Sequence, residues 1–439
     1  MCMASFIIRI VVVVLASFYF FPLNVTFLPG GMNTKKFMAA VGLVVLFVDL
    51  VRKRSIKADR SLLFCVLLSG LMSLAGVQST SVNGTSDMTY ATYIVSMAVW
   101  LGAAYLVVYV IRLVEGRADV MVLGQYLVSV CLLQCVTALL IDNVPAFKNW
   151  MLGWMTGFGF TGIGAGASRM FGMGAFLDVG GTRFAAGLLV LAAMIKEIVR
   201  KKRTAQIIAY IVSFAFILVV GSMIGRTTWA GAGMALVYWL LTSDFARMRP
   251  KVRNLVTRWV APLLLVLIPV AAVLYNGSPY FHDRVRFAFE SFFNWVEKGS
   301  FESHSTNMLR NMVVWPDNLK TWLIGDGYFQ GAANDPNFLG NPMMTDFYMW
   351  TDVGYCRFIF YFGLLGLGLF MWFFVQTAVV CSRRQPGFRL MFWMLVLLNF
   401  VIWLKVSTDI FVIIAPFMCL DFASSEEEDE TDIPPELDV

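Results

Sequence analysis

Long apolar segments recur along almost the whole chain and restrict its fold more than any other feature. Each is close to the length that crosses about 30 Å of hydrocarbon as an α-helix. The segments lie near residues 4–22, 36–51, 61–77, 91–114, 120–141, 184–199, 206–224, 227–242, 259–275, 351–380, 389–405 and 409–422. Only 14% of the residues are charged and 59% are apolar, which excludes a soluble enzyme, a disordered chain and a nucleic-acid-binding protein. The sequence therefore predicts an all-α, polytopic membrane bundle of about twelve transmembrane helices within residues 1–422.

Basic residues predict the orientation of this bundle. Loops that carry many Lys and Arg residues stay in the cytoplasm. More than half of the 34 basic residues fall in one alternating set of short loops, near residues 52–60, 112–117, 200–203, 247–258 and 383–389. Both termini are therefore expected in the cytoplasm. The carboxylate-rich residues 423–439 are expected to form a disordered cytoplasmic tail.

Two long loops, at residues 142–183 and 276–350, are expected on the outer side of the membrane. Loops of this length are uncommon unless they have a function. Within the larger loop, apolar residues at helical spacing over 283–298 predict an amphipathic helix on the membrane surface. A second helix is expected to begin after residues 303–306 and to end at Trp315 and Pro316.

The sequence contains no motif for nucleotide binding, zinc-protease or thiol-redox chemistry. Its two histidines, His282 and His304, are too few for a histidine-based metal site. Cys131 and Cys135 are one helical turn apart with no acidic residue or histidine nearby, so packing explains the pair better than metal binding. We therefore expect no metal site and no cofactor.

Arginines on the outer side are the candidate binding residues. Arg226 lies in GSMIGRTTW (221–229), between two spans with almost no loop. Its charge either snorkels to the interface or contacts a lipid phosphate or pyrophosphate. Two similar interpretations, a side chain in solvent or a side chain that contacts an anion, apply to Arg310, Arg169 and Arg183.

Asp352 and Arg357 lie five residues apart at the start of the span 351–380. Asp352 is either a helix cap or a general base. An unpaired Arg357 would be costly at the membrane, so a carboxylate and an arginine here would suit a base and an anion clamp. His304 is a second candidate base, with a simply solvated loop histidine as its alternative.

Four short motifs follow one another in a definite order. They are RMFG (169–172), SMIGRT (222–227), Arg310 before Trp315 and LIGDGY (323–328), and TDVGY (351–355) before GLLG (363–366). In this order, on one side of the predicted bundle, they resemble the motifs of the O-antigen polymerase and O-antigen ligase superfamily. The resemblance covers roughly residues 165–370. Family members often have His-Asn where this chain has Thr351 and Asp352, which favours a polymerase over a ligase.

The resemblance implies a GT-C-like, metal-independent glycosyltransferase in the bacterial inner membrane, with its active site facing the periplasm. Its substrates would be oligosaccharide repeat units on undecaprenyl pyrophosphate, and its other partners would be membrane lipids and a chain-length regulator, with no nucleic acid. An acceptor hydroxyl would attack the anomeric carbon of the donor, with Asp352 or His304 as the base. The residues expected to bind pyrophosphate or glycan in place of a metal are Arg226, Arg310, Arg357, Arg169 and Arg183.

Two other functions agree with parts of the same sequence. An O-antigen ligase would transfer finished glycan to lipid A core or to protein. A flippase or other transporter would move the lipid-linked oligosaccharide across the membrane. Transporters have charged residues at mid-span facing a central cavity, whereas here Arg9 is the main charge at such a position.

Overall fold

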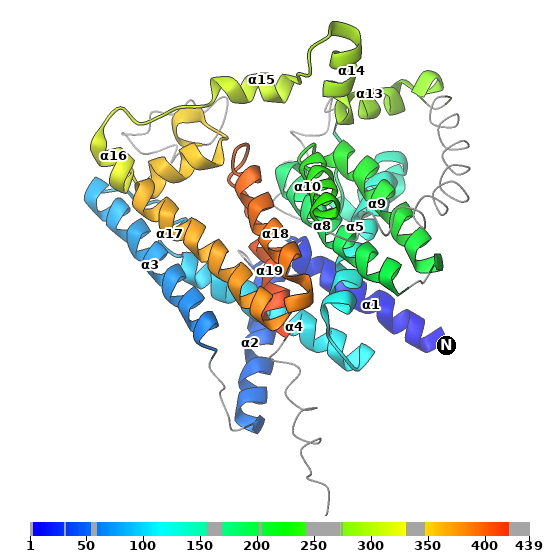
Figure 1. Ribbon diagram of the computed structural model, residues 1–439, viewed down its shortest axis with the longest axis horizontal. Coiled ribbons are helices and arrows are strands. Elements are labelled where there is room, and N and C mark those ends of the chain that lie inside the picture. The colour runs from blue at the N-terminus through cyan, green and yellow to red at the C-terminus, as the bar shows by residue number, and fades with distance from the viewer. Residues whose placement is uncertain are drawn as a thin grey trace, which may run out of the picture.

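The apolar segments of the sequence form long helices (Figure 1). The computed structural model describes residues 3–29, 32–53, 59–155, 169–201, 204–242, 273, 275–330 and 347–420. Over these residues the protein is all-α, as predicted, with isolated β-bridges and no β-strand. The long helices and the last, shorter one of the bundle are α1 (Met3–Phe20), α2 (Thr34–Lys53), α3 (Arg60–Asn83), α4 (Tyr93–Glu115), α5 (Val120–Asn143), α8 (Leu177–Arg200), α9 (Thr204–Ile224), α10 (Thr228–Leu241), α17 (Gly354–Arg384), α18 (Arg389–Ile402) and α19 (Phe411–Met418).

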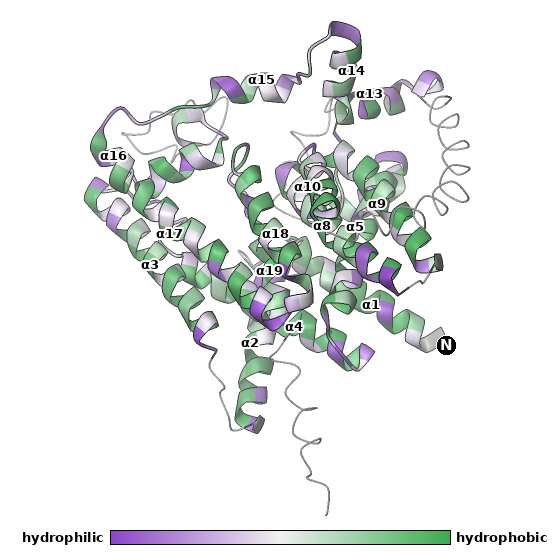
Figure 2. Ribbon diagram, viewed as in Figure 1, coloured by the Kyte–Doolittle hydropathy of each residue, from purple (hydrophilic) through white to green (hydrophobic). Residues whose placement is uncertain are grey.

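Among the described residues, five helices are long and apolar enough to cross a membrane, namely α3, α4, α5, α9 and α17. Helices α1, α10 and α18 are apolar but shorter. Large apolar side chains such as Phe6, Leu74 and Leu113 are exposed on this bundle, and Figure 2 shows that hydrophobic residues dominate its helices. The chain is therefore a multi-pass membrane protein. Every predicted segment coincides with a helix except 259–275, which lies almost entirely outside the described residues.

Helix α8 lies at the centre of the bundle, where it packs against α5, α9, α10 and α18 and is buried along most of its length. It begins at Leu177, so the outer loop predicted at 142–183 ends earlier than expected and Arg183 lies inside the helix. Close packing is the reason. A Cβ added at Gly181 would lie 3.0 Å from the carbonyl oxygen of Gly225, so this glycine allows α8 to approach the α9–α10 turn rather than ending the helix.

The short helices at one end of the bundle, drawn at the top of Figure 1, are α13 (Pro279–Ala288), α14 (Glu290–Lys298), α15 (His304–Asn311) and α16 (Leu319–Ile324). Other short elements among the described residues are α6 (Pro145–Leu152), η2 (Tyr348–Trp350) and η3 (Pro386–Phe388). The single amphipathic helix predicted over 283–298 is in fact two helices, broken at Phe289. Trp229 donates its indole N–H to the carbonyl of Ala288 at 3.1 Å, and the amide of Phe292 bonds to the carbonyl of Phe289 instead. The helical hydrogen-bond ladder is therefore interrupted at this point.

Helix α15 begins at His304, within the stretch 303–306 rather than after it, and it ends early. Ser303 is its N-cap, and the Ser303 hydroxyl accepts a hydrogen bond from the amide of Thr306 at 3.2 Å. The helix ends at Asn311 rather than near Trp315. Pro316 disfavours helical geometry at the residue before it, and the two valines before Trp315 lower the helix propensity further.

Helix α16 packs on a break in α17. At Gly363 the backbone of α17 leaves helical geometry with φ of 66°. A Cβ at Gly363 would lie 2.2 Å from the backbone of Leu323, so glycine is required for this approach. Just beyond α16, the amide of Asp326 donates to the carbonyl of Phe360 at 2.6 Å.

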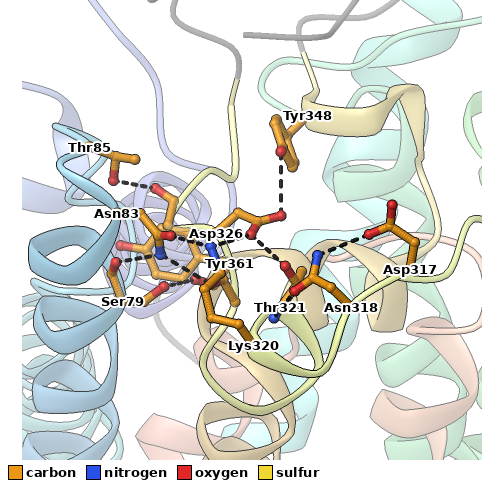
Figure 3. A network of polar contacts seen from close by, with 12 residues as sticks. Ser79, Asn83, Thr85, Asp317, Asn318, Lys320, Thr321, Asp326, Tyr348 and Tyr361 are labelled. Carbon is orange, nitrogen blue, oxygen red and sulfur yellow. Dashed lines mark hydrogen bonds and ion pairs between the residues drawn. The ribbon is translucent and has the colours of Figure 1, made fainter. Parts of the chain in front are cut away.

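Side chains around this junction form a polar network that joins α3, α16 and α17 (Figure 3). Asp326 accepts a hydrogen bond from the hydroxyl of Thr321 at 2.6 Å and lies 3.2 Å from the ammonium of Lys320. The hydroxyl of Ser79, on α3, donates to the carbonyl of Tyr361 at 2.6 Å. The motif LIGDGY, which begins at the end of α16, therefore packs against the break in α17 that contains the motif GLLG.

An irregular segment, residues 403–410, separates α18 from α19 inside the bundle. Trp403 at its start is fully buried, and the amide of Ile410 at its end donates to the side-chain oxygen of Asn399 at 3.0 Å. Irregular backbone at membrane depth is tolerated where protein buries it or where it lines a polar cavity. This break is longer than the sequence predicts, and it forms part of the candidate site.

Candidate functional site

A hollow of about 490 Å³ lies between the outer short helices and the bundle. Its walls come from the start of α8, the α9–α10 turn, α13, α15, the segment that leads into α17, and the irregular segment after α18. Its charged and hydroxyl-bearing lining residues include Arg169, Asp178, Arg226, Asp352, Arg357, Lys405, Ser407 and Thr408. Residues that are far apart in the sequence therefore converge on one site.

Arg169 and Arg226 lie against one aromatic ring. Their guanidinium carbons are 5.0 and 4.3 Å from the ring centroid of Phe287. Burial lowers the pKa of both arginines, and the charge of Arg226 lowers that of Arg169 further. Because arginine remains protonated even so, the two groups are half-buried cations held at one wall of the hollow.

Glu290, the first residue of α14, links Arg226 to α15. One of its carboxylate oxygens forms an ion pair with Arg226, and the other accepts a hydrogen bond from the amide of His304 at 2.9 Å. Any anionic ligand in the hollow would compete with Glu290 for the same guanidinium. The position of α15 is thus coupled to what Arg226 binds.

Arg357, in the first turn of α17, is only 5% exposed. It donates to the hydroxyl of Ser407 at 2.6 Å and to the carbonyl of Phe329 at 3.4 Å. Its guanidinium lies between the rings of Phe329 and Phe347, 3.7 and 3.4 Å from their centroids. Its buried Nε has no hydrogen-bond partner. These contacts fix one cation at the wall of the hollow, and its Nε remains able to donate a hydrogen bond.

Asp352 lines the hollow and does not cap α17. The N-cap residue of α17 is Val353, with no side-chain capping bond, and the amide of Val353 bonds to the hydroxyl of Thr351 at 3.2 Å. Burial raises the pKa of Asp352 above its usual value, and the nearby charge of Arg357 opposes that shift. The cap alternative is therefore not realised, and a half-buried carboxylate faces the hollow.

Two further charged residues of the hollow were not predicted from the sequence. Asp178, in the first turn of α8, accepts a hydrogen bond from the hydroxyl of Thr408. Lys405 is partly buried in the irregular segment after α18 and lines the same hollow as Arg226 and Arg169. A lone lysine at the end of an apolar segment was a usable signal for Lys405. The position of Asp178 had no comparable signal.

Three predicted site residues lie outside this hollow. His304 lines an adjoining polar hollow of about 500 Å³ that shares Arg169 and Arg226 with the main one. The side chain of Arg310 is 70% exposed and lies 3.9 Å from Glu302. Arg183 is buried in α8 with its guanidinium carbon 5.3 Å from the ring centroid of Phe21, and its Nε and Nη1 have no hydrogen-bond partner. The predicted residues that the structure does bring together are Arg169, Arg226, Arg357 and Asp352.

The charge in the main hollow is net positive. Three arginines and Lys405 line the hollow with two carboxylates, and Glu290 pairs with Arg226 from beside it, so the cations still outnumber the carboxylates. Guanidinium groups match phosphate oxygens bidentately, and a phosphate that displaced Glu290 would take its place on Arg226. Within the described part of the chain, no group of three or more His, Cys, Asp or Glu residues could hold a metal ion. The arrangement can bind a phosphate-type anion beside a carboxylate that is able to accept a proton.

Comparisons with known proteins add no family to this description. No protein-family model matches the sequence. No curated protein and no solved structure matches it either. The family expectation therefore depends on the four motifs and their order, and two of these motifs have the structural role of docking α16 on α17.

Proposed function

We propose that this protein is a metal-independent glycosyltransferase that polymerises oligosaccharide repeat units linked to undecaprenyl pyrophosphate. In this proposal the end of the bundle with α13–α16 faces the periplasm, the short basic loops face the cytoplasm, and the product is an O-antigen or capsule-type polysaccharide. The observation that carries the proposal is the convergence of Arg169, Arg226, Arg357 and Lys405 beside Asp352 in one hollow.

A pyrophosphate leaving group accounts for the excess of positive charge. As the acceptor attacks, the bond between the anomeric carbon and the phosphate oxygen breaks, and that oxygen gains negative charge. Arg226 lies against Phe287, and Arg357 is fixed between two rings, so both guanidinium groups are in position before the charge develops. Such preorganised cations stabilise the transition state in the way that a metal ion otherwise would.

Asp352 is the proposed general base. It takes the proton of the acceptor hydroxyl as the new bond to the anomeric carbon forms, and undecaprenyl pyrophosphate leaves as an anion. Asp178, the other carboxylate of the hollow, already accepts a hydrogen bond from Thr408 and is the weaker candidate. His304, in the adjoining hollow, is the alternative base.

Polymerisation by the purified full-length protein tests this proposal. Protein in liposomes receives lipid-linked repeat units in the presence of a metal chelator. We expect a ladder of products spaced by one repeat unit, with one undecaprenyl pyrophosphate released per bond. Arg226→Ala should lose the ladder, and Arg117→Ala is the matched control because the Arg117 side chain is 74% exposed and outside the hollow. No ladder from the unmodified protein, or a ladder that the chelator abolishes, would contradict the proposal.

The rival functions give different results in the same system. A ligase would use the lipid-linked glycan only when lipid A core or an acceptor protein is added. A transporter is favoured by one observation, the burial of Arg183 in α8 with Lys35 and Asp409 as charged neighbours. It would move the lipid-linked oligosaccharide across the liposome membrane without lengthening it.

A further inference from the structure

A second hollow, of about 340 Å³, adjoins the candidate site and has a different chemical character. It lies between α10, α14, α15 and α18, and most of its lining is apolar. The apolar residues that form its walls include Trp229, Ala230, Phe292, Phe301, Leu309 and Ile402. We refer to it as the apolar groove.

The apolar groove is continuous with the cationic hollow. Arg226, Thr227, Ser305, Leu309 and Lys405 line both. A ligand whose anionic group contacts Arg226 and Lys405 therefore has one direction in which a hydrocarbon chain attached to that group can leave water.

The side walls of the apolar groove belong to helices that present apolar side chains outward. On α10, Leu236 and Leu240 are 54% and 61% exposed, and on α18, Leu397 is 50% exposed. The two helices pack against each other, and Figure 2 shows both as predominantly hydrophobic. In a membrane protein such exposed apolar faces contact lipid chains. The apolar groove thus lies beside the bilayer as well as beside the anion site.

We infer that the apolar groove binds the first isoprenoid units of a lipid pyrophosphate whose phosphates occupy the cationic hollow. The inference rests on the proposed function and adds to it the path of the lipid chain, between α10 and α18 and beneath α14 and α15. A single chain ending in two negative charges matches an apolar groove that opens on Arg226 and Lys405. A phospholipid has two acyl chains on one phosphate, and a single apolar groove beside the cations has a place for only one of them.

Phe292 and Phe301 line the apolar groove with side chains that are 40% and 61% exposed. Their rings pack edge to face with centroids 5.3 Å apart and are partly exposed. Ala230, a small residue on α10, also lines the groove. A large side chain at Ala230 would therefore fill the groove without removing a charged group from the anion site.

Two donors that differ only in lipid length test the inference. Each carries the same repeat unit on pyrophosphate, one with a long polyprenyl chain and one with a single isoprene unit. Ala230→Phe should lower the preference for the long donor, measured as the ratio of kcat/KM values, by at least about tenfold. The control is Gly233→Phe on the same helix, where an added Cβ meets nothing within 4 Å and the residue does not line the groove. An unchanged ratio in Ala230→Phe, or an equal change in Gly233→Phe, would overturn the inference.

A binding measurement separates this inference from the transfer reaction. The full-length protein is photolabelled with a polyprenyl pyrophosphate that carries a diazirine on its second isoprene unit and no sugar. We expect the label on peptides that contain Ala230, Phe301 or Ile402. If the protein forms no polymer but is labelled there, the proposed function fails and the groove assignment stands. If it polymerises but the label lies elsewhere on the bundle, the groove assignment fails alone.

Discussion

Asp352→Asn removes a proton acceptor and leaves a side chain of almost the same size. As the general base, Asp352 should contribute about 10²- to 10⁴-fold to the rate, or about 3–5 kcal/mol of transition-state stabilisation. The same change should not destabilise the fold, because the Asp352 side chain does not cap α17. Burial raises the pKa of Asp352, so its ionised form disfavours folding at neutral pH, and a neutral asparagine removes that cost. The expected result is a large loss of rate with an unchanged or slightly higher unfolding temperature.

Initial rates of polymerisation on purified lipid-linked repeat units measure this effect. Asp317→Asn is the control and should match the unmodified protein, because the Asp317 carboxylate is exposed, lies outside the hollow and accepts a hydrogen bond from its neighbour Asn318. Asp178→Asn should lose less than about tenfold. The rate of the unmodified protein should fall as the pH is lowered through the pKa of Asp352, and this acid limb should be absent in Asp352→Asn. The reasoning is refuted if Asp352→Asn inserts normally and keeps a third of the rate, or if His304→Ala collapses instead.

Three further predictions concern other parts of the same structure. Arg226→Ala should slow polymerisation about 30- to 1,000-fold. Arg226→Lys should restore only part of the lost rate, because an ammonium cannot bind phosphate bidentately. Arg310→Ala should lower the rate less than about tenfold in the same assay. Lys405→Ala should weaken the affinity for a glycosyl polyprenyl pyrophosphate, measured as Kd, by roughly tenfold because Lys405 is one of the cations that line the hollow, whereas Lys405→Arg should retain it. Gly363→Ala should destabilise the protein by more than about 1 kcal/mol, because φ is positive there and a Cβ would clash with the backbone of Leu323. Gly368→Ala on the same helix, where an added Cβ meets no neighbour, should not lower the unfolding temperature. Equal unfolding temperatures for the two variants would contradict the docking of α16 on α17.

The membrane helices could be predicted because their cause is local. Each must satisfy its own backbone hydrogen bonds in hydrocarbon, so length and apolar composition determine it segment by segment. Their ends were less predictable. Helix α8 begins before Asp178 and continues through two glycines, since those glycines meet the α9–α10 turn. The break at Phe289 depends on Trp229, a residue about sixty positions away along the chain.

Part of the candidate site could also be predicted. Arg226, Arg357 and Asp352 were identified because charged residues at the ends of apolar spans are costly without a role. Arg310 had the same local signal, yet its side chain lies in solvent. Local sequence cannot distinguish these cases, because it does not say which way a residue at the end of a helix faces.

The sequence by itself determined that this chain is an all-α membrane protein with charge concentrated beside its apolar spans. Only the tertiary structure decided that Asp178 and Lys405 join the arginines in one hollow, that Arg183 is buried away from it, and that an apolar groove opens beside it. The physical reason is the range of the interactions. Transfer of a segment from water to lipid depends on that segment alone, whereas the sharing of one hollow depends on how α8, α10, α17 and α18 pack against one another.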